Sequence, residues 1–277
     1  MVSQEQRRRQ LAREKFLRQQ QRREDARRRG RTRNAVIASA LAVVLAGGAV
    51  SYAAGAFDGD DKKKKETDAA APPSKGPDPC AKPAAGKPKT ATYKKEPKLA
   101  IDESATYTMK LDTTCGAIDV ELDAAAAPRT VNSFDFLLDK GYLDHTTCHR
   151  LTTTGIYVLQ CGDPQGTGQG GPGYSIPDEN LKDKRLKGNV YPAGTVAMAN
   201  QYNPQTKQGR DTGGSQFFLV YQDSQLPPDY TPFGTVSAEG MKVLKKIADA
   251  GATAPDQMGM TKPNATVVIN KATVTSS

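Results

Sequence analysis

The sequence lacks several of the residues on which common catalytic sites depend. Its 277 residues include no tryptophan, two histidines (His145 and His149) and four cysteines. No Cys-x-x-Cys pair occurs, and no group of residues has the spacing of a hydrolytic triad. We therefore expect neither a metal ion nor a cofactor.

Net charge is also missing from most of the chain. Residues 1–34 contain 13 Arg or Lys and 4 Asp or Glu, a net charge of +9, which equals the net charge of the whole chain. The rest is balanced, with 26 basic side chains (39 less 13) and 26 acidic ones (30 less 4). We expect no nucleic-acid partner for that part, whereas the basic segment is predicted to lie near anionic lipid headgroups.

Residues 35–57 contain no charged side chain over 23 positions. At about 1.5 Å per residue, a helix of this length crosses roughly 30 Å of hydrocarbon, which predicts a single transmembrane helix. The arginines before it predict a cytoplasmic N-terminus and an extracytoplasmic C-terminal part in the cell membrane. The alternative is a signal peptide cleaved after Ala56, because the preceding small residues resemble a cleavage site.

Two regions of different composition follow. Residues 58–99 are rich in Lys, Pro and Ala, with almost no large apolar side chain, so they are predicted to form a disordered linker. Residues 100–277 contain short alternating segments bounded by turn residues, which predict a folded domain.

The pattern within 100–277 indicates a mainly β fold. Residues 106–112 and 117–123 alternate apolar and polar side chains around a Cys-Gly turn, which predicts a hairpin. Helices are predicted over 128–141 and 237–251 from apolar side chains on one face. Further strands are predicted over 157–162, 194–199, 216–221, 233–236 and 265–274. Many short strands with two helices suggest a closed antiparallel barrel with capping helices.

The glycine-rich segment 166–173 is a weak candidate for a phosphate loop. No Lys-Ser or Lys-Thr follows it, and no buried strand leads from it into a helix. The informative motifs lie on either side. They are Cys-His-Arg-Leu (148–151), Gln-Cys-Gly-Asp-Pro and its glycine-rich continuation (160–174), Gly-Thr-Val-Ala-Met-Ala-Asn (194–200), Gly-Gly-Ser-Gln-Phe-Phe-Leu-Val-Tyr (213–221) and Leu-Pro-Pro-Asp-Tyr-Thr-Pro-Phe-Gly-Thr-Val (226–236).

These motifs, in this order, resemble the cyclophilin family of peptidyl-prolyl cis-trans isomerases over about 175 residues. The resemblance implies a closed antiparallel eight-stranded barrel capped by two helices. It also implies an enzyme that isomerises X-Pro bonds and so assists protein folding. Given the predicted membrane topology, we expect its substrates to be exported or cell-surface polypeptides, and we expect a monomer.

The resemblance also implies roles for single residues. Arg150 matches the catalytic arginine, and Gln160 matches the glutamine that orients it. The implied substrate-binding residues are Tyr157, Val158, Ala199, Asn200, Gln216, Phe218, Leu226 and Tyr230. Such an arginine would stabilise the twisted amide, whose resonance is lost, by donating to the prolyl carbonyl oxygen or the pyramidal nitrogen.

The sequence departs from the family pattern in places. The stretch between Arg150 and Gln160 is about two residues longer than usual, which affects the alignment of Tyr157 and Val158. The loop 201–213 is about seven residues longer than the compact family version. Gln225 aligns with a position that is often tryptophan, so we expect weak cyclosporin binding.

The four cysteines allow three complete pairings, and the sequence does not choose among them. Cys148 and Cys161 lie on the two arms of one predicted hairpin, next to Arg150 and Gln160, which favours a disulfide between them. The alternative is buried thiols in a reduced core.

Two other functions compete with the enzyme. A binding module could hold proline-containing segments, or act as a chaperone, with little turnover, although simple capture would not require Arg150. A membrane scaffold organised by the basic segment would explain residues 1–57 but not the motifs that follow.

Overall fold

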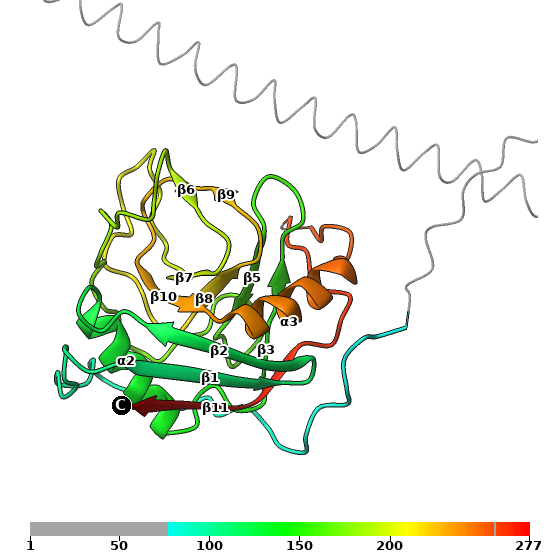
Figure 1. Ribbon diagram of the computed structural model, residues 1–277, viewed down its shortest axis with the longest axis horizontal. Helices are drawn as coiled ribbons and strands as arrows, with labels where there is room; N and C mark the ends of the chain where they lie inside the picture. The colour runs from blue at the N-terminus through cyan, green and yellow to red at the C-terminus, as the bar shows by residue number, and fades with distance from the viewer. Residues whose placement is uncertain (1–76, 258) are drawn as a thin grey trace, which may run out of the picture. The chain divides into compact units, whose positions relative to one another are not determined.

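The computed structural model of the protein describes residues 77–257 and 259–277 (Figure 1). These residues belong to one compact unit, Ala70–Ser277. The predicted basic segment 1–34, membrane span 35–57 and first part of the linker, 58–76, lie outside the described residues. Within the described ranges, no helix is both long enough and apolar enough to cross a membrane.

One antiparallel sheet of nine strands dominates the fold, in the order β3-β11-β1-β2-β10-β7-β8-β5-β4. Its strands are β1 (Tyr107–Thr113), β2 (Gly116–Leu122), β3 (Thr146–Thr147), β4 (Arg150–Leu151), β5 (Val158–Cys161), β7 (Thr195–Met198), β8 (Phe217–Val220), β10 (Pro232–Val236) and β11 (Val268–Ser276). Two short strands, β6 (Val190–Tyr191) and β9 (Ser224–Gln225), pair separately. A mainly β fold with two helices is thus confirmed.

The prediction of a closed eight-stranded barrel is wrong in two respects: the sheet has nine strands, and its first and last strands do not pair with each other. β3 and β4 end the strand order and do not pair with each other, although only Cys148 and His149 separate them along the chain. At these two residues the main-chain hydrogen bonds pass from one end of the sheet to the other. The N–H of Cys148 donates to the carbonyl of Val267, and the N–H of His149 donates to the carbonyl of Gln160. The two ends of the sheet are therefore connected by the continuous chain and not by hydrogen bonds between β3 and β4.

The predicted first hairpin forms between β1 and β2, with Thr113 opposite Gly116. Alternate side chains of both strands are buried, among them Met109 and Ile118. This is the inward-and-outward alternation that the sequence pattern predicted.

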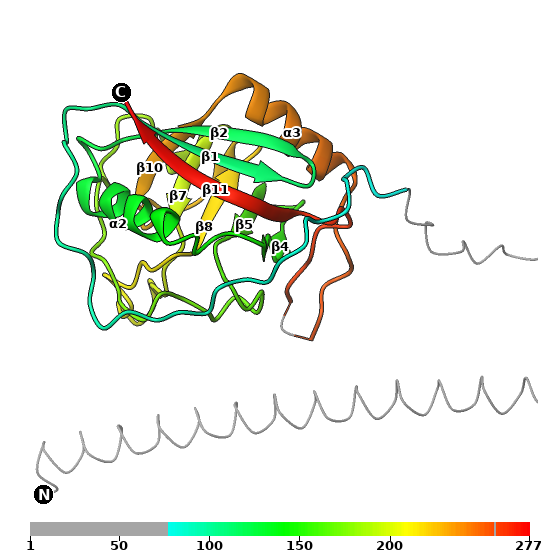
Figure 2. The same cartoon turned by 90° about the horizontal axis from the view of Figure 1, so that it is seen from below.

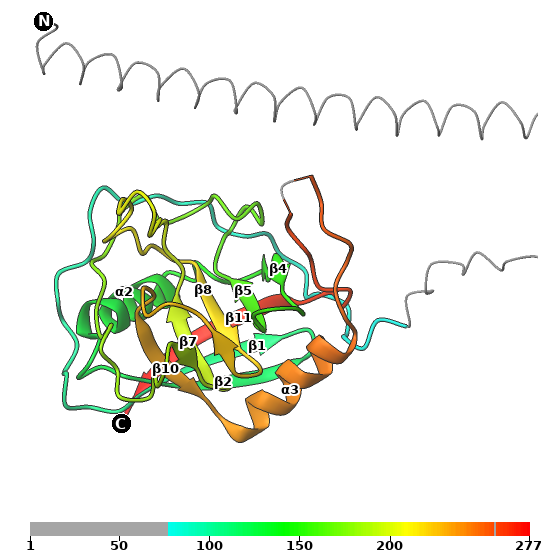
Figure 3. The ribbon, with the colours of Figure 1, turned by 90° about the horizontal axis from the view of Figure 1, so that it is seen from above.

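Helices α2 (Pro128–Asp139) and α3 (Ala238–Asp249) lie apart from each other, against β11 and β2 respectively (Figure 3), and both face the same core. Pro128 occupies the first turn of α2, where no backbone N–H is needed, and Gly141 follows its end with a φ of 62°. The hydroxyl of Ser237 accepts from the N–H of Gly240 and caps α3.

A distant residue completes the start of α2. No side chain next to the helix caps it. The Glu179 carboxylate instead accepts hydrogen bonds from the N–H groups of Arg129 and Thr130, at 3.1 and 2.9 Å. A negative group at a helix N-terminus also complements the helix dipole. The loop that carries Glu179 is therefore fixed to α2.

Residues 77–99 pass around the outside of α2 before the chain enters β1 (Figure 2). A disulfide joins Cys80 to Cys115, and the N–H of Ala81 donates to the carbonyl of Thr114 at 2.8 Å. The Tyr93 ring lies 5.0 Å from that of Phe136, and its N–H donates to the carbonyl of Pro172 at 2.7 Å.

The predicted disordered linker is therefore wrong for residues 77–99. Its composition offers little apolar surface, which is why the sequence favoured disorder. Here the segment is held by a covalent bond, one aromatic side chain and main-chain hydrogen bonds, none of which depends on a high apolar content. We call residues 77–99 the strap.

The core lies between the sheet and the helices. Phe134 of α2 is fully buried, and its ring lies 4.8 Å from that of Phe233 and 5.5 Å from that of Phe217. These contacts connect α2 to β10 and β8. They fix the position of β8, which carries candidate site residues on its other face.

Candidate active site

The antiparallel pair β4 and β5 places Arg150 directly opposite Gln160. Residues opposite each other in a ladder project from the same face of the sheet, so both side chains point the same way. A disulfide between Cys148 and Cys161 joins the same two arms of the chain. The sequence between them, residues 149–160, therefore begins and ends at a fixed position.

A series of hydrogen bonds continues from Arg150 across the sheet. Arg150 Nη1 donates to Gln160 Oε1 at 3.4 Å, and Gln160 Nε2 donates to Gln216 Oε1 at 2.9 Å. Gln216 Nε2 donates in turn to the carbonyl oxygen of Gly170 at 2.9 Å. Each amide accepts on one side and donates on the other, so the series fixes the orientation of both glutamines. We call Arg150, Gln160 and Gln216 the polar wall.

The charge of Arg150 is not neutralised by a carboxylate. Across residues 77–257 and 259–277, no acidic side chain forms an ion pair with it, and its buried Nε has no hydrogen-bond partner. A guanidinium carries five N–H donors, and the one contact with Gln160 leaves most of them available. Arg150 can therefore donate to a bound molecule.

An apolar pocket of about 140 Å³ opens beside Arg150. Its apolar lining, which we call the apolar wall, consists of Ile156, Val158, Ala199, Phe218, Leu226 and Tyr230. The rings of Phe218 and Tyr230 meet edge to face, with centroids 5.4 Å apart. Burial raises the pKa of Tyr230, with Asp229 adding to the shift and Arg150 opposing it. The Tyr230 hydroxyl therefore stays uncharged near neutral pH.

A larger cavity of about 490 Å³ adjoins the pocket, because Gln160, Ala199 and Asn200 line both. Its other walls come from the glycine-rich segment, residues 168–175, from Gln201 and Thr212 of the long loop, and from residues 214–216 just before β8. We call the two neighbouring cavities together the groove, with a small apolar part and a wider polar part. Such a groove can accept an extended peptide that inserts one apolar side chain.

Asp163 organises the glycine-rich segment. Its carboxylate accepts from the N–H groups of Gln165, Thr167 and Gly168 at 2.6–2.9 Å. Burial alone would raise the pKa of Asp163, but these bonds and one from Gly170 hold it below its ordinary value. The N–H groups thus point towards a carboxylate of the protein itself, which explains why the segment does not serve as a phosphate loop.

The comparisons with known proteins concern the same residues. The family model described as "Cyclophilin type peptidyl-prolyl cis-trans isomerase/CLD" matches residues 108–274, which is more than half of the chain. The chain belongs to the cyclophilin family.

Individual relatives differ in how much of them the chain covers. A "Probable peptidyl-prolyl cis-trans isomerase B" of Mycobacterium leprae is 48% identical over 157 residues, 54% of this chain and 51% of that protein. The chain thus spans about half the length of this relative. A "Peptidyl-prolyl cis-trans isomerase" of Helicobacter pylori is 39% identical over 56% of this chain and 87% of that protein. A solved cyclophilin type isomerase of Cryptosporidium parvum has a TM-score of 0.49 and 27% identity, covering 62% of this chain and 99% of that chain.

The structure brings together nearly all the residues that the cyclophilin resemblance singled out. Nine of the ten predicted catalytic and substrate-binding residues line the groove: Arg150, Val158, Gln160, Ala199, Asn200, Gln216, Phe218, Leu226 and Tyr230. Cys148 and Cys161 lie directly beside this set, joined as described above.

Tyr157 is the exception. Its ring lies 5.9 Å from that of Tyr221, and its N–H donates to the hydroxyl of Ser224 at 2.8 Å. Tyr157 immediately precedes β5, and it packs against Tyr221 while Val158, the first residue of the strand, lines the pocket. Ile156 takes the place predicted for Tyr157.

Two contributors to the site were missed from the sequence. Tyr191 is fully buried behind the pocket, and its hydroxyl donates to the carbonyl of Tyr230 at 2.7 Å. Gly170 supplies the acceptor at the end of the polar wall, and a Cβ there would lie 1.9 Å from a carboxylate oxygen of Asp163. Only glycine permits this approach. Neither role has a local sequence signal, because each depends on a residue that is distant in the chain.

Proposed function

We propose that this protein is a peptidyl-prolyl cis-trans isomerase that acts on X-Pro bonds of exported or cell-surface polypeptides and assists their folding. The observation that carries the proposal is the placement of Arg150. Its guanidinium has no ionic partner among the described residues and lies at the edge of a small apolar pocket in a groove suited to an extended chain.

The reaction breaks no covalent bond, so the enzyme needs no nucleophile and transfers no proton. Its barrier of about 18–20 kcal/mol arises because the twisted amide loses its resonance. In that state the nitrogen becomes pyramidal and its lone pair can accept a hydrogen bond. A donor that Gln160 and Gln216 hold in place stabilises the twisted state more than either planar isomer.

The apolar wall contributes in a different way. The proline ring fits beside Phe218 and Val158, which fixes one side of the amide while the residue before it turns. Because the pocket touches only the ring, it binds both isomers and the twisted state alike. Its contribution is therefore to affinity and orientation.

The test compares the full-length protein with its Arg150→Ala variant in an isomerisation assay on proline-containing peptides. The parent should accelerate the reaction, and the variant should lose a factor of about 100–1,000 in kcat/KM. Equal acceleration by both would exclude the mechanism. Peptide binding by the parent without acceleration would instead favour a binding module.

We further propose that residues 35–57 anchor the protein in the cell membrane, with the isomerase domain outside and the basic segment near anionic lipid. The charge-free run supports an anchor, and the two disulfides support an oxidising compartment. Protease added to intact cells that express the full-length chain should digest the domain. Complete protection of the domain would contradict this location.

A further inference from the structure

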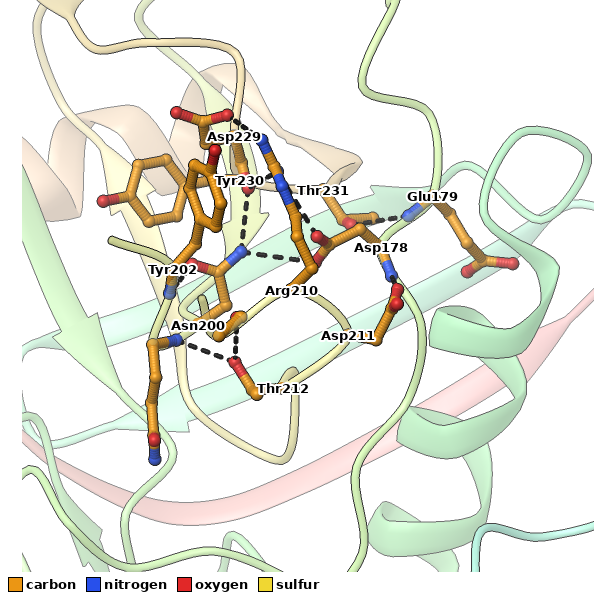
Figure 4. Close-up of polar contacts among 12 residues, drawn as sticks. Asp178, Glu179, Asn200, Tyr202, Arg210, Asp211, Thr212, Asp229, Tyr230 and Thr231 are labelled. Atoms are coloured by element: carbon orange, nitrogen blue, oxygen red, sulfur yellow. Dashed lines mark hydrogen bonds and ion pairs between the residues drawn. The ribbon is translucent and has the colours of Figure 1, made fainter. Parts of the chain in front are cut away.

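The loop 201–213 folds back so that Arg210 returns to the side of Asn200 (Figure 4). The side chain of Asn203 accepts from the N–H groups of Gln205 and Thr206, which turns the chain. At Gly209, with a φ of 86°, a Cβ would lie 2.2 Å from the carbonyl oxygen of Gln201. The two arms of the loop can therefore cross closely only because this residue is glycine.

The guanidinium of Arg210 contacts two carboxylates and one ring (Figure 4). It forms ion pairs with Asp178, at 3.3 Å, and with Asp229, and it lies over the ring of Tyr202 at 3.5 Å from the centroid. The side chains of Asp178 and Asp229 are only 7% and 14% exposed. Two largely buried carboxylates thus depend on one arginine for their charge balance.

Asn200 binds the same two residues as Arg210. Its Nδ2 donates to Asp178 Oδ1 at 3.2 Å and to the carbonyl oxygen of Asp229 at 2.8 Å, and that carbonyl also accepts from Arg210. We call Asp178, Asn200, Arg210 and Asp229 the rim cluster. It joins three segments that are distant in the sequence.

The rim cluster has a rigid base. Next to Asp178, the Glu179 side chain caps α2, and the N–H of Glu179 donates to the hydroxyl of Thr231 at 2.8 Å. The N–H of Asp178 donates to Asp211 in the long loop, at 2.9 Å. The segment 178–179 is therefore held by α2, by Thr231 and by the long loop. Because Asp178 is fixed in this way, the ion pairs of Arg210 determine where Asp229 lies relative to it.

Two members of the rim cluster connect it directly to the groove. Asn200 lines both cavities, and Asp229 immediately precedes Tyr230 of the apolar wall. In contrast, no polar contact of Arg210 in the described part of the chain reaches the polar wall. A change at Arg210 should thus move the binding surfaces and leave the donor Arg150 in place.

We infer that Arg210 is a positioning residue for the substrate groove, which sets the distance between Asn200 and Tyr230 through Asp178 and Asp229. This inference rests on the proposed isomerase function. It assigns the additional length of loop 201–213 to substrate affinity, because the loop delivers the arginine to the rim.

The test measures kcat and KM separately for the full-length parent and its Arg210→Gln variant on one proline-containing peptide. KM should rise about fivefold or more, while kcat stays within about twofold. Arg185→Gln is the matched control. Arg185 also forms ion pairs with two carboxylates, those of Asp123 and Asp183, and its side chain is also 35% exposed. Neither arginine lines either cavity, but the partners of Arg185, unlike Asp229, are not adjacent in sequence to any residue that lines one.

Both arginine variants should lower the melting temperature, whereas only Arg210→Gln should raise KM. If Arg210→Gln does not fold, Tyr202→Leu provides the second variant, because it removes the ring under the guanidinium but leaves both ion pairs. It should raise KM in the same direction by a smaller factor. An unchanged KM in the folded variants, an equal rise in Arg185→Gln, or a fall in kcat alone would each overturn the inference.

If the parent binds the peptide but does not accelerate its isomerisation, the proposed function is wrong, but this inference can still be tested. The dissociation constant of the same peptide, measured by calorimetry, then replaces KM, and Arg210→Gln should still weaken it about fivefold or more. A parent that neither turns over nor binds the peptide would overturn both.

Discussion

The polar wall of the groove is held by directional hydrogen bonds, whereas the apolar wall is held by packing. Arg150, Gln160 and Gln216 are half-buried and are joined side chain to side chain. Val158 and Phe218 are buried against Tyr191 in a cluster separate from the main core. The two walls meet at the small pocket, which Arg150 and Gln160 line together with the apolar wall. They are held by different interactions, so they can be altered separately.

This difference separates two contributions to the proposed reaction. A hydrogen-bond donor distinguishes a planar amide from a twisted one, because the lone pair becomes available only in the twisted state. An apolar contact with the ring does not distinguish them, because the ring itself changes little. Changes in the polar wall should thus affect kcat, and changes in the apolar wall should affect KM and stability.

Phe218→Ala gives the largest expected change in stability. The side chain is 5% exposed, and its removal leaves a cavity next to Tyr230 and Tyr191. We expect the free energy of unfolding to fall by about 3–5 kcal/mol and KM to rise. Denaturant unfolding and steady-state kinetics measure the two effects. A folded variant with the KM of the parent would show that the apolar wall does not hold the substrate.

The double variant Cys148→Ser and Cys161→Ser tests the support of the polar wall. The disulfide closes a loop between residues 13 positions apart, which contributes about 3 kcal/mol to the free energy of unfolding. Because the disulfide also holds the strands that carry Arg150 and Gln160, kcat should fall together with stability.

The matched control removes the other disulfide, with Cys80→Ser and Cys115→Ser. This disulfide joins the strap to the β1–β2 turn and touches neither wall. Its loss should lower the denaturant midpoint and leave kcat unchanged. Equal effects of the two double variants on kcat would show that the hairpin disulfide acts only on stability.

Gln216→Leu removes the second link of the polar wall while Arg150 stays in place. The lost hydrogen bonds correspond to about 1 kcal/mol, or roughly a fivefold fall in kcat with KM nearly unchanged. Gln222→Leu, at an exposed position that lines neither part of the groove, is the control and should behave as the parent. A larger effect on KM than on kcat would place Gln216 in substrate binding alone.

The smallest expected effect concerns pH. Burial is the main cause that lowers the pKa of His149 from its ordinary 6.5, with Arg150 and Lys262 adding to the shift and Asp163 opposing it. Below pH 6.5 the unfolded chain therefore binds a proton that the folded state does not. Stability should fall as pH drops from 6.5 to the lower folded pKa, and it should not depend on this group above 6.5.

His149→Gln should reduce that fall in stability, as measured by unfolding at pH 5 and pH 8. Neither wall of the groove carries a histidine or a carboxylate. The pH profile of kcat should accordingly stay flat between these values. A kcat that follows the titration of His149 would mean that the residue acts on the polar wall.

The features that were predictable from the sequence depend on residues close together in the chain. The β1–β2 hairpin and both helices follow from local alternation and turn residues, and the pairing of Arg150 with Gln160 follows from the cyclophilin motifs. The assignment of Tyr157 to the pocket failed because motif alignment, and not strand alternation, was used to place it. Alternation from Gln160 through Val158 leads directly to Ile156.

The remaining features depend on contacts between distant residues. Glu179 caps a helix about 50 residues before it, and Arg210 pairs with Asp178, 32 residues away. Neither residue carries a motif, and each reads in the sequence as a solvated charge. The strap was not predicted for a related reason. One tyrosine, one cysteine and main-chain hydrogen bonds to distant residues hold a segment whose overall composition is typical of disorder.

The disulfide between Cys80 and Cys115 has a consequence for the release of the domain. A protease that cuts the chain once between these two residues leaves both pieces covalently joined. Separation of the folded domain from the preceding chain then requires two chemically different events, hydrolysis of a peptide bond and reduction of a disulfide. A cut within this interval alone, or reduction alone, leaves the domain attached to the residues that precede Cys80.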